Sequence, residues 1–167
     1  MTNKWIHPDD LQAIRNNMHG RDVIITDILT DTGFRLDDVM HLRRCNVSGR
    51  LVRLRERKTG RQRTAILSPE TQRALQEYAA HRHTLGYLFP ALRKYKRKKQ
   101  HRTTYWRHFE QACEKAGLGD KGYSPHSLRK VYAVNLLQRT GSLKAVQDDL
   151  GHTNIAVTAL YALSDRL

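Results

Sequence analysis

The chain of 167 residues carries 30 lysines and arginines against 16 aspartates and glutamates, a formal net charge of +14. Its length is enough for one domain with its own core. No apolar run reaches the roughly 18 residues of a membrane span or resembles a signal peptide, so we expect a cytoplasmic protein. A positive excess of this size attracts polyanions, which makes DNA or RNA the expected partner and an acidic membrane surface the minor alternative.

The sequence shows no sign of a metal or nucleotide site. Cys45 and Cys113 stand alone, without a CxxC pair, which predicts two reduced thiols rather than a disulfide or a metal centre. There is neither a cluster of carboxylates suited to Mg²⁺ nor a glycine-rich phosphate loop. We therefore expect no cofactor.

The first part of the chain predicts helices joined by tight turns. His7-Pro8-Asp9-Asp10 is typical of a helix start, because proline suits the first helical position and acids suit the first turn. A second helical segment, Val23–Leu29, continues to Thr32-Gly33, where glycine can adopt the left-handed conformation of a helix end. Apolar residues spaced from Leu36 to Leu42 then indicate a short helix.

The middle of the chain predicts a β-hairpin with a basic tip. Leu51–Arg55 alternates apolar and basic residues as a half-buried strand does, and Thr64–Leu67 is a second strand candidate. Lys58-Thr59-Gly60-Arg61 lies between them and forms the expected turn. Ser68-Pro69-Glu70 then opens a helix, with serine as its cap and proline at its first position.

The second half of the chain is predicted to be helical after one basic loop. Residues 93–99, Arg-Lys-Tyr-Lys-Arg-Lys-Lys, are typical of a solvated loop and also suit contacts with phosphates. Helices are expected over Thr103–Ala116, Pro125–Thr140, Leu143–Leu150 and Ile155 to about Ala162. The resulting fold class is mainly α with a small antiparallel β-sheet at one edge (α+β).

A polar cluster stands at the start of the helix predicted from Pro125. Ser124 caps this helix, and His126 and Arg129 share one face of its first turn. Free backbone N–H groups and the positive end of the helix dipole favour anions there. A histidine that can exchange a proton beside a guanidinium suits a phosphodiester, although His-x-x-Arg by itself is common on protein surfaces.

Two further clusters accompany this one. Leu150-Gly151-His152 predicts a helix end with the histidine in a sharp corner, and Tyr161 follows that histidine by nine residues. Asp31-Thr32-Gly33-Phe34-Arg35 predicts a tight turn with its arginine at the start of the next helix. Taken singly, each cluster has an ordinary interpretation. Tyr161 would be a core tyrosine, and Arg35 would be a solvated arginine.

Taken together, the clusters and the hairpin resemble the catalytic domain of the tyrosine recombinases, or phage integrases. That family combines a Thr-Gly-x-Arg turn, a hairpin lysine, His-x-x-Arg, Leu-Gly-His and a tyrosine nine residues after the last histidine. The matching residues occur here in the same order: Arg35, Lys58, His126, Arg129, His152 and Tyr161. Asp38 matches an acid often found three positions after the first arginine, and the resemblance spans about residues 7 to 163.

The resemblance is incomplete in two respects. Residues 130–134, Lys-Val-Tyr-Ala-Val, differ from the family's common continuation and indicate a change in packing that leaves the chemistry of His-x-x-Arg intact. The family's N-terminal DNA-clamping domain has no counterpart here, so we expect residues 1–167 to form a single catalytic domain without it.

The resemblance implies a site-specific recombinase or integrase that cleaves and rejoins DNA through a 3′-phosphotyrosine, without metal or ATP. Arg35 and Arg129 would hold the phosphate, with a further hydrogen bond from His152, while Tyr161 attacks. Lys58 would protonate the leaving 5′-oxygen. His126 would assist the proton loss of the tyrosine or orient the phosphate, and Asp38 would support the site.

The implied partner is double-stranded DNA, bound by four copies of a protein that is a monomer without it, in a bacterial, phage or plasmid setting and away from membranes. Basic residues of the hairpin and the loop are candidate DNA contacts: Arg57, Arg61, Arg63, Arg93, Lys94, Lys96, Arg97, Lys98 and Lys99.

Three alternatives stay open. A type IB topoisomerase or a hairpin-forming telomere resolvase shares the first chemical step and differs in what is rejoined. A DNA-binding module without activity is disfavoured because all six catalytic positions are filled. A metal-dependent nuclease is disfavoured because the chain lacks a cluster of acids.

Overall fold

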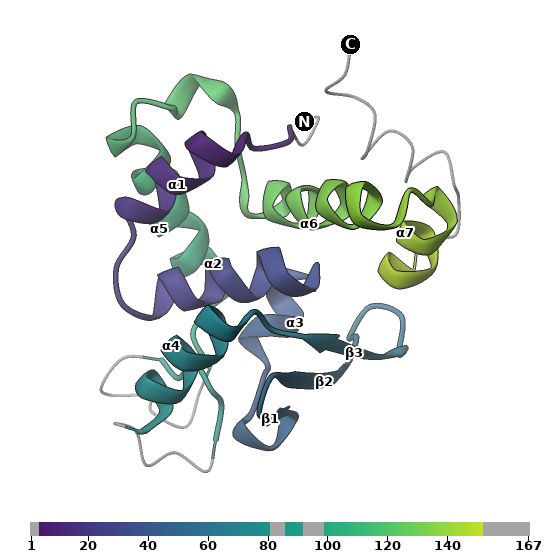
Figure 1. Ribbon diagram of the computed structural model, residues 1–167. Helices are drawn as coiled ribbons and strands as arrows, with labels where there is room; N and C mark the ends of the chain where they lie inside the picture. The colour runs from purple at the N-terminus through teal and green to yellow at the C-terminus, as the bar shows by residue number, and fades with distance from the viewer. Residues whose placement is uncertain (1–3, 81–85, 92–98, 152–167) are drawn as a thin grey trace.

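The computed structural model describes residues 4–80, 86–91 and 99–151 (Figure 1). In chain order its elements are α1 (Pro8–Asn16), α2 (Arg21–Thr32), α3 (Leu36–Met40), η1 (Arg44–Asn46), β1 (Val47–Ser48), β2 (Leu51–Arg55), β3 (Gln62–Ile66), α4 (Pro69–Ala80), α5 (Arg102–Lys115), η3 (Gly119–Lys121), α6 (Pro125–Thr140) and α7 (Leu143–Leu150). The expected fold class, mainly helical with a small antiparallel sheet, is confirmed. The helix expected from Ile155 lies outside the described residues.

Helix α2 runs through the middle of the fold, between α6 on one side and α3, α4 and the sheet on the other (Figure 1). Its residues Ile25, Ile28 and Leu29 are buried and belong to the main apolar cluster. Burial on several sides explains why this segment lacks the one-sided apolar stripe of a surface helix. The end of α2 is therefore held inside the molecule, and the chain turns there toward Arg35.

The three strands form an antiparallel sheet in the order β1-β2-β3. In the β2–β3 pair, Leu51 lies opposite Ile66 and Arg55 lies opposite Gln62, so β3 begins two residues before the predicted Thr64. The two-residue strand β1 was not predicted, because so short a segment carries no periodic pattern. The alternating burial of β2 continues to Glu56, which places that carboxylate on the inner side of the sheet.

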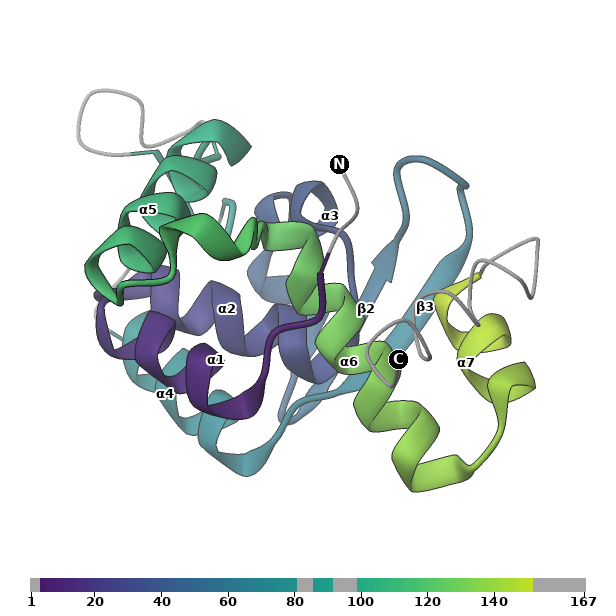
Figure 2. The same cartoon turned by 90° about the horizontal axis from the view of Figure 1, so that it is seen from above.

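Helices α6 and α7 form a unit beside the sheet, and their bounds agree with the prediction. Ala133 of α6 packs with Val146 and Leu150 of α7 in a second, smaller apolar cluster. Seen from above, α7 lies next to β3 and the β2–β3 turn (Figure 2). This packing brings the C-terminal end of α7 close to the hairpin and to the turn after α2.

Candidate active site

One cavity of about 370 Å³ collects three of the residues that the sequence motifs singled out. Arg35 reaches it from the α2–α3 turn, and His126 and Arg129 reach it from the first turn of α6. The lining consists of Phe34, Arg35, Leu36, Asp37, Arg102, Thr103, Trp106, Pro125, His126 and Arg129. Three guanidinium groups, those of Arg35, Arg102 and Arg129, and one imidazole thus border a space large enough for a phosphodiester.

The turn that places Arg35 depends on glycine at position 33. Gly33 ends α2 in the left-handed conformation with φ of 60°, as predicted. A Cβ added there would lie 2.3 Å from Cδ1 of Tyr132, so the ring of this α6 residue packs directly on the glycine backbone. Arg35 follows as the N-cap residue of α3, and its Nη1 lies 2.8 Å from Oε1 of Glu56. This buried carboxylate is an anchor for the arginine.

Arg129 is part of the protein interior as well as of the cavity wall. A capping box between Ser124 and Ser127 starts α6, with Pro125 at the first position, as the sequence predicted. Arg129, only 2% exposed, donates to the backbone oxygens of Gly33 and Leu150, the latter at 2.7 Å. It therefore ties the turn before Arg35 to the end of α7.

The surroundings of His126 favour the uncharged form of its imidazole. Burial lowers the pKa of its imidazole from the ordinary value, and the positive charges of Arg129 and Arg35 lower the pKa further. A neutral imidazole at neutral pH can accept a proton or donate one hydrogen bond. This state suits the role of proton acceptor or phosphate ligand that the family resemblance implies.

An NMR titration checks this state of His126. In the DNA-free protein we expect the imidazole to titrate below its ordinary pKa of about 6.5. Arg35→Gln removes a neighbouring positive charge and is expected to raise the pKa of His126. Arg15→Gln is the control, because Arg15 pairs with Asp27 and does not line the cavity. An unchanged titration in Arg35→Gln would contradict the electrostatic part of the explanation.

The β2–β3 turn carries Lys58, which is exposed. Hydrogen bonds hold the turn in place on both sides of this lysine. The hydroxyl of Thr59 donates to Oε2 of Glu56 at 2.6 Å, and the backbone N–H of Arg57 donates to Oδ1 of Asp38 at 2.9 Å. Asp38, predicted to support the site, therefore acts on the hairpin turn, and burial raises the pKa of its carboxyl.

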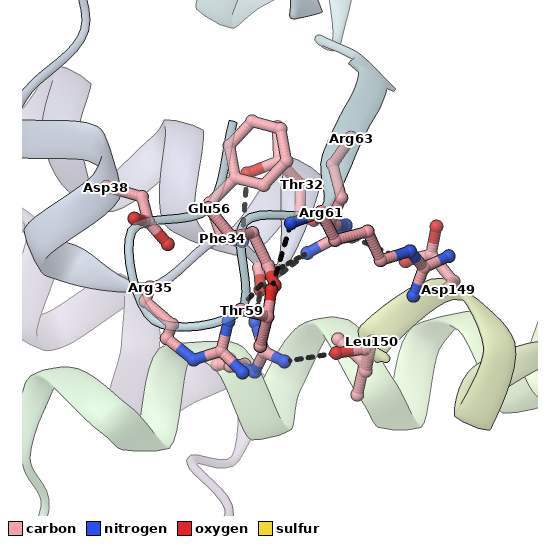
Figure 3. Close-up of polar contacts among 12 residues, drawn as sticks. Thr32, Phe34, Arg35, Asp38, Glu56, Thr59, Arg61, Arg63, Asp149 and Leu150 are labelled. Atoms are coloured by element: carbon pink, nitrogen blue, oxygen red, sulfur yellow. Dashed lines mark hydrogen bonds and ion pairs between the residues drawn. The ribbon is translucent and has the colours of Figure 1, made fainter. Parts of the chain in front are cut away.

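The prediction that Arg63 contacts DNA is wrong. Its side chain is 2% exposed, and its guanidinium bonds the backbone oxygen of Thr32 at 3.1 Å and the carboxylate of Asp149 at 2.8 Å (Figure 3). The guanidinium also lies over the ring of Phe34, 4.9 Å from its centroid. An arginine enclosed in this way cannot reach a phosphate of DNA.

The other candidate DNA contacts fall into two groups. Arg57 and Arg61 are exposed, and Lys99 lies within 3.8 Å of Asp37, which also pairs with Arg57 at 3.4 Å. The remaining residues lie outside the described part of the chain: Arg93, Lys94, Lys96, Arg97, Lys98 and the two catalytic candidates His152 and Tyr161. The described chain ends at Gly151, whose left-handed conformation ends α7 as predicted.

Glu56 is a site residue that we did not predict. It is the only acid between Arg50 and Arg63, and the alternation of the preceding strand extends to it. A buried acid among arginines is expected to be paired, so this signal was present in the sequence. Burial alone would raise the pKa of Glu56, but the hydrogen bond from Thr59 and the charges of Arg35 and Arg63 lower it overall, which keeps the carboxylate ionised.

Three findings concern the described residues only. They contain no group of three or more histidines, cysteines, aspartates or glutamates that could hold a metal ion. None of their helices is long and apolar enough to cross a membrane. Cys45 and Cys113 are both free thiols, as predicted.

Comparison with known proteins places this site in a family. Among curated proteins, the tyrosine recombinase XerD of Chlamydia pneumoniae is 30% identical over 167 aligned residues, which cover 90% of this chain and 52% of the relative. The tyrosine recombinase XerA of Pyrococcus furiosus is 28% identical over 144 residues, covering 84% and 49% respectively. The chain thus spans about half the length of the curated relatives that it matches.

Solved structures share the fold. The crystal structure of XerA recombinase superposes with a TM-score of 0.81 at 24% identity, covering 98% of this chain and 61% of that one. A lambda integrase dimer bound to a COC′ core site gives a TM-score of 0.76 at 18% identity, covering 96% and 48%. The sequence profile of the phage integrase family matches residues 4–166, nearly the whole chain. The chain therefore belongs to the phage integrase family.

Proposed function

We propose that the chain is the catalytic domain, over residues 1–167, of a site-specific DNA recombinase. The observation that supports this most directly is the cavity in which Arg35, His126 and Arg129 converge from two distant segments. Two guanidinium groups suit the charge of a phosphodiester, and the lowered pKa of the histidine favours an imidazole that is free to accept a proton. Membership of the phage integrase family supports the same reaction.

In the proposed reaction, the hydroxyl oxygen of Tyr161 attacks phosphorus and the bond from phosphorus to the 5′-oxygen breaks. Arg35 and Arg129 stabilise the charge on the nonbridging oxygens, and His152 adds a hydrogen bond to them. The tyrosine proton passes to His126, and Lys58 gives a proton to the departing 5′-oxygen. The products are a 3′-phosphotyrosine and a free 5′-hydroxyl, and the reverse reaction rejoins a strand without ATP.

The substrate that we propose is double-stranded DNA. The charge of +14 supports binding to a polyanion, and a protein of similar fold, the Tn1549 transposon integrase, was solved in complex with a circular intermediate DNA. The exposed Arg57 and Arg61 of the β2–β3 turn are candidate phosphate contacts. We also propose four copies on two duplexes and a monomer without DNA. Since the substrate is DNA, we place the reaction in the cytoplasm, in a bacterial, phage or plasmid setting.

The test is capture of the covalent intermediate. The protein is incubated with a pool of nicked duplexes of random sequence, on which the cleaved fragment diffuses away and rejoining fails. We expect a protein–DNA adduct that survives denaturation, forms in excess EDTA without nucleotide, and maps to Tyr161 by mass spectrometry. Recovered DNA then reports the preferred site. The proposal is contradicted if the wild type forms no more adduct than Tyr161→Phe, or if adduct formation requires Mg²⁺.

A sulfur substitution tests the role of Lys58. An ammonium can protonate the leaving 5′-oxygen, whereas a guanidinium is far too weak an acid to do so readily. Lys58→Ala is therefore expected to cleave an ordinary duplex very slowly and a duplex with 5′-bridging sulfur at nearly the wild-type rate, because a thiolate leaves without protonation. Arg57→Ala and Arg61→Ala serve as controls and should weaken binding without this rescue. Equal slowness of Lys58→Ala on both substrates would make His126 the leading candidate for the acid.

A further inference from the structure

Arg63 occupies a buried position near the start of β3. It lies opposite Leu54 in the strand pairing and faces the same inner side of the sheet. Its side chain is 2% exposed, which is unusual for an arginine and requires that its charge and its N–H groups be satisfied within the protein. The partners that satisfy it come from three separate parts of the chain.

The contacts of the guanidinium can be followed in Figure 3. Nη2 donates to the backbone oxygen of Thr32 at 3.1 Å and to Oδ2 of Asp149 at 2.8 Å. Nη1 donates to the backbone oxygen of Gly33 at 3.4 Å and lies 3.7 Å from Oε1 of Glu56. These contacts link the turn after α2, the end of β2 and the last turn of α7.

Each of these linked segments leads directly to a residue of the proposed mechanism. The partner lies two or three positions before that residue in every case: Gly33 before Arg35, Glu56 before Lys58, and Asp149 before His152. Glu56 adds a side-chain link, because the same carboxylate oxygen is also 2.8 Å from Nη1 of Arg35. The guanidinium of Arg63 thus contacts all three chain segments that precede these residues.

A guanidinium is suited to this task because it is planar and always charged, and it presents several N–H donors in a rigid fork. A lysine at position 63 would keep the charge but could not direct donors to both backbone oxygens and both carboxylates in the same way. Small shifts of catalytic groups are costly, since a misplacement of about 1 Å can slow a reaction about 10²-fold.

We propose that Arg63 is a positioning residue that sets the placement of the α2–α3 turn with Arg35, the hairpin turn with Lys58 and the last turn of α7 relative to one another. For its effect on cleavage this inference rests on the proposed function. It assigns to Arg63 an action on the catalytic residues from within the protein, distinct from the DNA contact that its position in a basic hairpin suggested.

The test compares Arg63→Lys with the wild type in single-turnover adduct formation on the nicked duplex. We expect adduct formation to slow about 10²-fold while duplex affinity changes less than about threefold, because Arg63 reaches no phosphate. All rates are measured at a temperature at which circular dichroism shows the variant fully folded. If Arg63→Lys does not fold, Asp149→Asn replaces it, since this change keeps the size of the partner and removes its charge.

Two controls separate positioning from general stability. Tyr132→Phe removes the hydrogen bond that the tyrosine hydroxyl donates to Asp149 at 2.8 Å and leaves the contacts of Arg63 in place. Arg15→Lys weakens another arginine–aspartate pair, that with Asp27 at 2.7 Å, which is outside the cavity lining. Both controls are expected to form the adduct within a few-fold of the wild-type rate. Slowing in the controls equal to that in Arg63→Lys would overturn the proposal.

A double-mutant cycle provides a readout that a purely structural role leaves unchanged. If Arg63 acts by placing Arg35, then Arg63→Lys costs much less in an Arg35→Lys background than in the wild type. Additive losses in this cycle, or a wild-type rate in Arg63→Lys, would overturn the proposal.

Amide hydrogen exchange keeps this inference distinct from the proposed function. If the wild type forms no adduct, the proposed function fails, and exchange still tests the placement of the three segments. In Arg63→Lys we expect faster exchange in residues 32–38, 55–61 and 147–151 together, whereas Tyr132→Phe should affect the last segment alone. Unchanged exchange in the first two segments would overturn the positioning role of Arg63.

Discussion

Tyr161→Phe is expected to abolish the covalent protein–DNA adduct and to leave duplex affinity nearly unchanged. The substitution removes only the phenolic oxygen, which in the proposed reaction is the atom that attacks phosphorus. The groups that would hold the phosphate, Arg35 and Arg129, are untouched by it. Adduct formation on the nicked duplex and binding to an intact duplex, measured at the same salt concentration, separate the two effects.

Two buried tyrosines in the described part of the chain, Tyr105 and Tyr132, are poor substitutes for this nucleophile. Tyr105 is fully buried with its hydroxyl 2.8 Å from that of Thr26, and burial raises its pKa. Tyr132 packs against Gly33 in the turn before Arg35, but burial and the carboxylate of Asp149 raise its pKa as well. A phenol with a raised pKa is less readily ionised, so neither tyrosine is expected to attack a phosphodiester.

The matched control is therefore Tyr132→Phe, which removes one hydroxyl, bonded to Asp149 in the last turn of α7. We expect this variant to retain the adduct, because its ring continues to pack on Gly33 and only the bond to Asp149 is lost. An adduct of full strength in Tyr161→Phe, together with its loss in Tyr132→Phe, would show that the nucleophile had been assigned to the wrong tyrosine.

Much of the helical part of the fold could be predicted because residues at the helix ends mark the boundaries. Ser68 receives the N–H of Thr71 as a cap, and Gly33 and Gly151 end their helices in the left-handed conformation, as their positions indicated. The short helix α3 ends at Met40 and not at Leu42. Apolar spacing alone does not mark a helix end, which depends on where the chain must turn to pack.

Arg63 shows where local reasoning fails. In the sequence it is one of several cations around a turn, and such residues are solvated in most proteins. Its burial follows from the register of β2 with β3, which places it beside Leu54, and from its pairing with Asp149, which is distant in sequence. The same limit applies to Arg129, whose motif was evident but whose bonds to Gly33 and Leu150 arise only from tertiary packing.

Arg129→Ala is expected to lose cleavage and stability together, whereas Arg35→Ala is expected to lose mainly cleavage. Both variants remove a phosphate donor, which costs roughly 10²–10³ in rate in sites of this kind. Arg129 in addition satisfies the backbone oxygens of Gly33 and Leu150 in the interior. The oxygen of Gly33 keeps a longer bond from Arg63 at 3.4 Å, whereas the oxygen of Leu150 loses this donor, at a cost of about 1–3 kcal/mol of unfolding free energy. For a chain of this size, each kcal/mol lowers the melting temperature by about 2–4 °C.

Arg35 has a different environment. Its side chain is 25% exposed, and its partner Glu56 keeps the hydrogen bond from Thr59 and the charge of Arg63 when the arginine is removed. The buried carboxylate is therefore not left uncompensated, and a smaller loss of stability follows. Arg→Lys should restore little cleavage at either position, because an ammonium lacks the bidentate fork that a phosphate accepts.

Thermal unfolding and single-turnover adduct formation, each measured on both alanine variants, decide between these expectations. The rates are compared at a temperature at which both variants are folded, so that a difference in rate reports on the phosphate contact and not on the folded fraction. A wild-type melting temperature in Arg129→Ala would show that its bonds to Gly33 and Leu150 contribute little to the fold. Near-normal cleavage by both variants would place the phosphate-binding groups elsewhere in the chain, because neither guanidinium would then be needed to stabilise the charge on the phosphate.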